Sequence, residues 1–87
     1  MIGNAVSSWM WGNCTWQQMA DTIGPRTDNV AFEVVKEALS ILSIRGGTPE
    51  GVSKMNMLVE HYTAQSALSY YLNQPEFHNI REKLVTP

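Results

Sequence analysis

Residues 27–50 read TDNVAFEVVKEALSILSIRGGTPE, and this stretch decides the fold. Its polar side chains recur at helical spacing on one side, while apolar side chains fill the rest of the circumference. The apolar arc is wider than contact with a single neighbouring helix requires. A capping residue, Thr27 or Asp28, precedes the pattern, and a Gly-Gly pair stops it. The stretch therefore predicts a central helix over about 28–44.

A second long helical pattern follows, over about residues 48–73. Thr48 is its expected N-cap, followed by proline and an acidic residue, which suit the first turn of a helix. The apolar face of this pattern rotates after Tyr62. We therefore expect either a continuous helix that changes its packing partner or a helix broken near Thr63. Pro75 then starts a short last helix.

The N-terminal segment predicts two shorter helices. The first lies near residues 2–10, and the second begins at about Thr15, whose hydroxyl can cap it. Gly24 and the proline after it end the second helix. Sustained alternation of apolar and polar residues, the strand signal, is nearly absent. We expect an all-α fold, a small bundle of four or five helices that forms a single domain over residues 1–87.

Composition points to a surface short of charge. Hydrophobic residues make up 44% of the 87 residues, but charged residues make up only 16%, against about 25% in typical globular domains. A small domain with few charges is expected to expose apolar patches, which commonly mark contact sites. The net charge is −2, and the six basic residues are scattered. No basic stripe for nucleic acid is formed, so we do not expect nucleic acid as the main partner.

The sequence also bears on location. The single cysteine, Cys14, excludes an internal disulfide framework and fits a reducing compartment. No basic residue precedes Arg26, so the charged start of a signal peptide is missing. No apolar run approaches the roughly 18–20 residues of a membrane span. We expect a cytoplasmic protein with no transmembrane segment.

No motif in the chain indicates catalysis, a cofactor or a metal. His61 and His78 lack the spacing of a helical metal site, and Cys14 has no nearby ligand partner. No serine has the flanking glycines of a nucleophile elbow. We therefore expect a protein that is not an enzyme, with no catalytic residue, no cofactor and no metal.

Aromatic residues instead favour a protein-binding role. Tryptophan and tyrosine side chains are enriched in binding hot spots because each buries a large, rigid area. The expected partner is protein, either further copies of this chain in a homo-oligomer or one larger protein. The alternative is a purely structural role, in which the tryptophans complete the hydrophobic core. The candidate contact residues are Trp9, Trp11, Trp16, Tyr70 and Tyr71.

The alternative function is a small DNA-binding regulator that uses residues 15–44 as a helix-turn-helix. Ala20, Gly24 and Val30 match the spacing of that motif. Its start, however, carries acidic rather than basic residues, and phosphate contacts normally supply most of the DNA affinity. In this alternative the DNA-binding residues are Arg26, Thr27 and Asn29.

Overall fold

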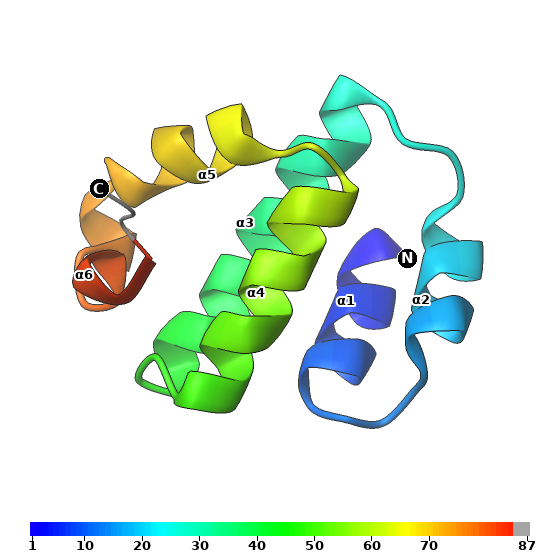
Figure 1. The fold of residues 1–87 in the computed structure, drawn as a ribbon, viewed down its shortest axis with the longest axis horizontal. Coiled ribbons are helices and arrows are strands. Elements are labelled where there is room, and N and C mark those ends of the chain that lie inside the picture. Colours follow the sequence, from blue (N-terminus) through cyan, green and yellow to red (C-terminus); the bar gives the residue numbers. More distant parts are fainter. Residues whose placement is uncertain (85–87) are drawn as a thin grey trace.

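The structure, a computed structural model, describes residues 1–84 (Figure 1). These residues form helices and connecting turns, with no strand among them, so the all-α prediction is confirmed. None of the helices in this part of the chain combines the length and apolar character that crossing a bilayer would need. The elements are α1 (Ile2–Met10), α2 (Trp16–Ile23), α3 (Asp28–Ile44), α4 (Pro49–His61), α5 (Gln65–Leu72), the 3-10 helix η1 (Pro75–Phe77) and α6 (Arg81–Leu84).

Helix α3 is the centre of the bundle, as its apolar arc predicts. It packs against α1, α4, α5 and η1. Figure 1 shows α3 and α4 as an antiparallel pair, with α1 and α2 on one side and α5 to α6 on the other. Five side chains of α3 are completely buried: Val34, Val35, Ala38, Leu39 and Leu42. The core therefore lies on all sides of α3 that face another helix.

The predicted helix start at Thr15 is confirmed by its hydrogen bonds, and of the two caps expected for the central helix, Thr27 or Asp28, the structure uses Thr27. The Thr15 hydroxyl accepts from the Gln18 backbone N–H at 3.1 Å, and Gln18 Oε1 accepts from the Thr15 N–H at 2.9 Å. This reciprocal pair satisfies two backbone donors of the first turn of α2. The Thr27 hydroxyl likewise accepts from the Val30 N–H at 3.2 Å at the start of α3. Threonine at each cap thus fixes where the helix begins.

The predicted cap at Thr48 is only half right. Pro49 does occupy the first turn of α4, as expected. The Thr48 side chain, however, makes no capping hydrogen bond, and its hydroxyl is buried without a partner. Its backbone torsions still direct the chain into the helix. The helix start is therefore set by proline geometry rather than by a side-chain acceptor.

The long helix expected over about 48–73 is broken at Thr63, so the continuous form is wrong. Helix α4 ends at His61, and Thr63 takes a positive φ of 51°. The Ala64 N–H donates to the Val59 carbonyl at 2.9 Å, and the Thr63 N–H donates to the Glu60 carbonyl at 3.3 Å. These two bonds form a Schellman motif, in which glycine is the usual left-handed residue. The turn sends α5 across the start of α3 (Figure 1).

Candidate functional site

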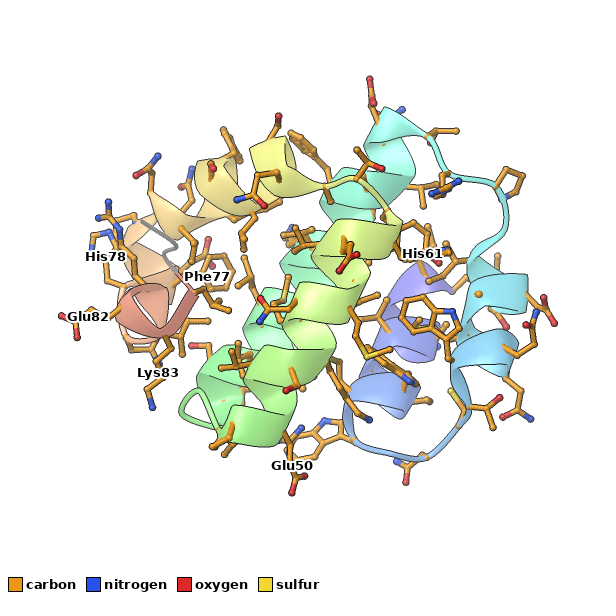
Figure 2. The ribbon with its side chains drawn as sticks, in the orientation of Figure 1. Glu50, His61, Phe77, His78, Glu82 and Lys83 are labelled. Atoms are coloured by element: carbon orange, nitrogen blue, oxygen red, sulfur yellow. The ribbon has the colours of Figure 1, made fainter. Side chains whose placement is uncertain are left out.

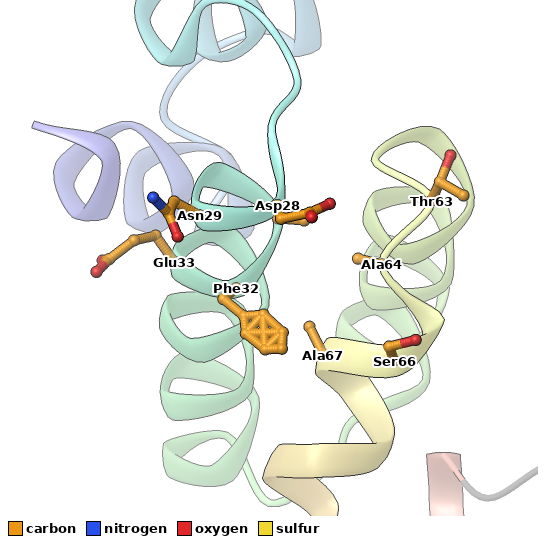
Figure 3. A pocket seen from close by; sticks show the side chains of 9 residues that line it. Asp28, Asn29, Phe32, Glu33, Thr63, Ala64, Ser66 and Ala67 are labelled. Atoms are coloured by element: carbon orange, nitrogen blue, oxygen red, sulfur yellow. The ribbon is translucent and has the colours of Figure 1, made fainter.

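An open groove lies between the first turns of α3 and the segment from Thr63 to Ala67. Its volume is about 790 Å³. Figure 3 shows Asp28 and Phe32 projecting from α3 toward that segment, while Asn29 and Glu33 lie on the other flank of α3. The lining residues are Asp28, Asn29, Ala31, Phe32, Glu33, Thr63, Ala64, Ser66 and Ala67. We call this feature the α3–α5 groove.

The groove exists because small side chains occupy the crossing of α3 and α5. Ala31, Ala64 and Ala67 are buried where the two elements meet. Alanine lets the backbones approach closely but fills little of the space beside the crossing. The Schellman turn at Thr63 sets the direction in which α5 leaves α4. The groove therefore lies where this turn brings α5 against α3.

Three aromatic side chains pack together beside the groove, and we call them the aromatic surface: Phe32, Tyr70 and Tyr71. The Phe32 ring centroid lies 5.8 Å from that of Tyr70 and 5.9 Å from that of Tyr71. The two tyrosine rings lie 5.1 Å apart in an edge-to-face arrangement. Tyr70 is 56% exposed, whereas Phe32 and Tyr71 are half-buried. The surface is thus exposed and held in place by ring contacts.

Trp9 and Trp16, two of the candidate contact residues, are placed inside or against the core. Trp9 is buried, and its ring meets that of Trp16 edge-on at 5.0 Å. The Trp16 ring also meets the imidazole of His61 at 5.1 Å and lies near Tyr62. The Lys54 ammonium lies over the Trp9 ring. Trp9 therefore joins α1 to α4, and a partner could touch it only after the bundle opened.

Burial in this cluster changes the acidity of Tyr62. Its side chain is almost completely covered. Removal from water raises the pKa of Tyr62 above its ordinary value of 10.0, and the nearby positive charge of Arg26 partly offsets the rise. The phenol therefore holds its proton more firmly in the folded chain than in the unfolded one.

Trp11 is the tryptophan that the structure leaves on the surface. It follows the end of α1 and is 48% exposed. The Arg45 guanidinium lies 5.0 Å from the centroid of the Trp11 ring. Arg45 also donates to the Met10 carbonyl at 2.8 Å and lies 3.8 Å from a carboxylate oxygen of Glu50. Trp11 is thus exposed yet fixed by the arginine beneath it.

Two of the three residues expected to contact DNA are occupied by structural bonds. Arg26 donates to the His61 carbonyl at 2.6 Å, and the Thr27 hydroxyl caps α3. Asn29 is exposed, but it stands between the carboxylates of Asp28 and Glu33 in the chain. These carboxylates would repel phosphate. The placement of the three residues gives the DNA-binding hypothesis no support.

The two histidines lie far apart. Figure 2 shows His61 on the side of α1 and α2, and His78 at the opposite end of the molecule beside Glu82. In residues 1–84 no three His, Cys, Asp or Glu side chains come together closely enough to hold a metal ion. Neither histidine is therefore part of a candidate site.

Phe32 and Asp28 were missed by the sequence reasoning as site residues. Local patterns place Phe32 in the buried arc of α3 and Asp28 in its first turn, and both descriptions are true as far as they go. What exposes them to the groove is the crossing of α5, which no local pattern encodes. The one available signal was the rotated apolar face after Tyr62, because it marked α5 as a separate element.

Comparisons with protein-family models, with curated proteins and with solved structures found no match to this chain. The case for a function therefore rests on the geometry of this chain's own residues.

Proposed function

We propose that this protein is a non-enzymatic protein–protein interaction module, which acts by self-association or by docking on one larger protein. The observation that carries the proposal is the aromatic surface beside the α3–α5 groove. Tyr70 is more than half exposed, and its ring packs on Phe32 at 5.8 Å. A tyrosine already held by its neighbours loses little conformational freedom when a partner covers it. Such anchors typically dominate binding energy.

Trp11 supports the same proposal at the other end of the bundle. Its ring is about half exposed and rests against Arg45. Tryptophan and arginine are both enriched at hot spots, and here they form one ordered unit. The protein would therefore present two aromatic contact points, one at each end of α3. We further expect it to act in the cytoplasm, since its single cysteine suits a reducing compartment.

Light scattering behind size-exclusion chromatography tests self-association. The protein is measured at several concentrations and at low and high salt, together with Tyr70→Ser and the control Met57→Ser. Met57 is 50% exposed on α4 and does not line the groove. We expect an oligomer that persists in high salt, because apolar contacts are strengthened rather than screened. Tyr70→Ser should shift it toward monomer, and Met57→Ser should not.

Docking on a different protein is tested by photo-crosslinking in the producing cells. A benzophenone amino acid is placed at position 70 or, as the control, at position 57. A discrete adduct formed from position 70 but not from position 57 would show that the aromatic surface docks on a different protein. A monomer at every concentration, together with no adduct specific to position 70, would remove the proposal altogether.

A further inference from the structure

We propose that the α3–α5 groove binds a basic segment of a partner protein, with an arginine or lysine side chain lying along Phe32 and its charged head at the Asp28 carboxylate. This inference rests on the proposed function, because it names the chemistry of the partner that the aromatic surface would meet. It is carried by the charge of the groove, by its shape and by the packing of its rings.

One charged side chain projects into the groove, and it is the acidic Asp28 (Figure 3). Glu33 also borders the groove, but its carboxylate lies on the other flank of α3, and no Lys, Arg or His is among the lining residues. The nearest cations along the chain are Arg26, whose guanidinium donates to the His61 carbonyl, and Lys36, which lies outside the lining. Within residues 1–84 the one ion pair joins Arg45 and Glu50, away from the groove. The Asp28 carboxylate therefore has no ion-pair partner in the part of the chain that the structure describes.

The shape suits a long side chain with an apolar stem. Ala64 and Ala67 project from the segment opposite α3, and the Phe32 ring lies on the α3 side (Figure 3). Arginine and lysine cover apolar surface with their methylene stems while the charged head stays polar. Asp28 projects across the groove from the first turn of α3, within reach of a head group placed beside the ring. An arginine could stack on Phe32 and meet the carboxylate at once.

The packing of the aromatic surface decides where the cation goes. Its three ring centroids lie 5.1 to 5.9 Å from one another, so the rings touch and leave no space between them for an ammonium group. They do not form an open cage. Phe32 is the member of the aromatic surface that also lines the groove. A cation held by both ring and carboxylate must therefore lie in the groove itself.

Charge also selects the partner. Two copies meeting groove to groove would bring the Asp28 carboxylates of both copies together. Like charges at an interface oppose association. The groove therefore favours a partner segment rich in arginine or lysine over the groove of a second copy of this chain.

The test is a titration of ¹⁵N-labelled protein with hexa-arginine, followed by two-dimensional NMR, with hexa-glutamine as the neutral peptide. We expect hexa-arginine to shift the amide signals of residues 28–33 and 63–67, and hexa-glutamine to leave them in place. Asp28→Asn should weaken the binding about three- to fivefold, the effect expected for one partly exposed ion pair. Phe32→Leu should weaken it as well. Asp21→Asn, which changes an exposed carboxylate on α2, should not.

Each outcome separates this inference from the proposed function. Shifts spread evenly over all acidic positions, or equal losses for Asp28→Asn and Asp21→Asn, would overturn the inference. Concentration-dependent shifts of the groove signals that occur without any peptide and persist in Tyr70→Ser would also overturn it, because a second copy would then occupy the groove. If the protein formed a Tyr70-dependent oligomer but did not bind hexa-arginine, the proposed function would be supported, and the inference of a basic segment in the groove would be rejected. Thermal unfolding of each variant confirms that it is folded.

Discussion

Tyr62 shows how a single buried phenol connects packing to pH. Its ring packs near that of Trp16 and beside that of His61, and its side chain is almost completely covered. Ionising it there would place a negative charge where solvation is poor, and Arg26 compensates only in part. The sequence predicted Tyr62 as a member of the apolar stripe of α4. It could not predict the raised pKa, because the Trp16 ring that packs near Tyr62 comes from a distant part of the chain.

We therefore expect the protein to lose stability in alkali, and Tyr62→Phe to lose less. The folded pKa exceeds the unfolded value of 10.0, so the folded state binds more protons around and above that pH. The contribution is complete below pH 10.0 and disappears as the pH rises through the folded pKa. Denaturant unfolding of both proteins, at about pH 9 and at steps above it, gives for each protein the slope of the free energy of unfolding against pH. Parallel alkaline slopes for the two proteins would show that Tyr62 does not control this loss.

At the scale of helices, the ends of α3 and α4 use the same motif with different residues. After α3 the left-handed position is Gly46, with φ 69°, and after α4 it is Thr63, with φ 51°. Both turns have the hydrogen bonds of a Schellman motif. The glycine was recognisable in the sequence as a helix stop. At Thr63 only the rotation of the apolar face indicated a break, because threonine is a poor residue for this conformation.

Exchanging these residue types should have opposite effects on stability. Thr63→Gly removes the clash of a β-branched side chain at positive φ and should stabilise the fold by about 1 kcal/mol. Gly46→Thr introduces the same strain and should destabilise it by a similar amount. Space is not the obstacle at Gly46, since nothing lies within 4 Å of an added Cβ. Urea unfolding of both variants measures the pair. A loss of stability in Thr63→Gly would mean that the threonine side chain itself holds α4 to α5.

For the whole molecule, α3 joins two flanking units. One unit is α1 with α2, and the other is α5 with η1; each packs against α3. The central helix was predictable because its apolar arc is too wide for one partner. The arrangement around it was not, since the choice of which helix covers which face depends on the turns at Gly24, Gly46 and Thr63. The α3–α5 groove and the exposure of Tyr70 both follow from this arrangement, so neither could be predicted from the sequence.

This arrangement predicts that a destabilising substitution in α3 loosens helices throughout the molecule, whereas one in α6 affects only the elements next to it. Leu39 is completely buried in α3, and Leu39→Ala should cost about 2–5 kcal/mol, a large part of the roughly 5–15 kcal/mol that holds a domain folded. Because α3 supports both flanking units, hydrogen exchange should accelerate in α1, α4 and α5 together. Leu84 is also buried but lies in the four-residue helix α6.

Leu84→Ala is therefore the matched comparison, with the same atoms removed at the edge of the bundle. Hydrogen exchange of this variant should accelerate in η1 and α6 and remain near that of the unmodified protein in α1 and α4. Terminal elements open at lower free energy than the core, so their loss need not unfold the rest. If Leu39→Ala left the exchange of α5 unchanged, α5 would be stabilised without α3. The α3–α5 groove could then not be a rigid site, and the aromatic surface would lose the preorganisation on which its proposed role depends.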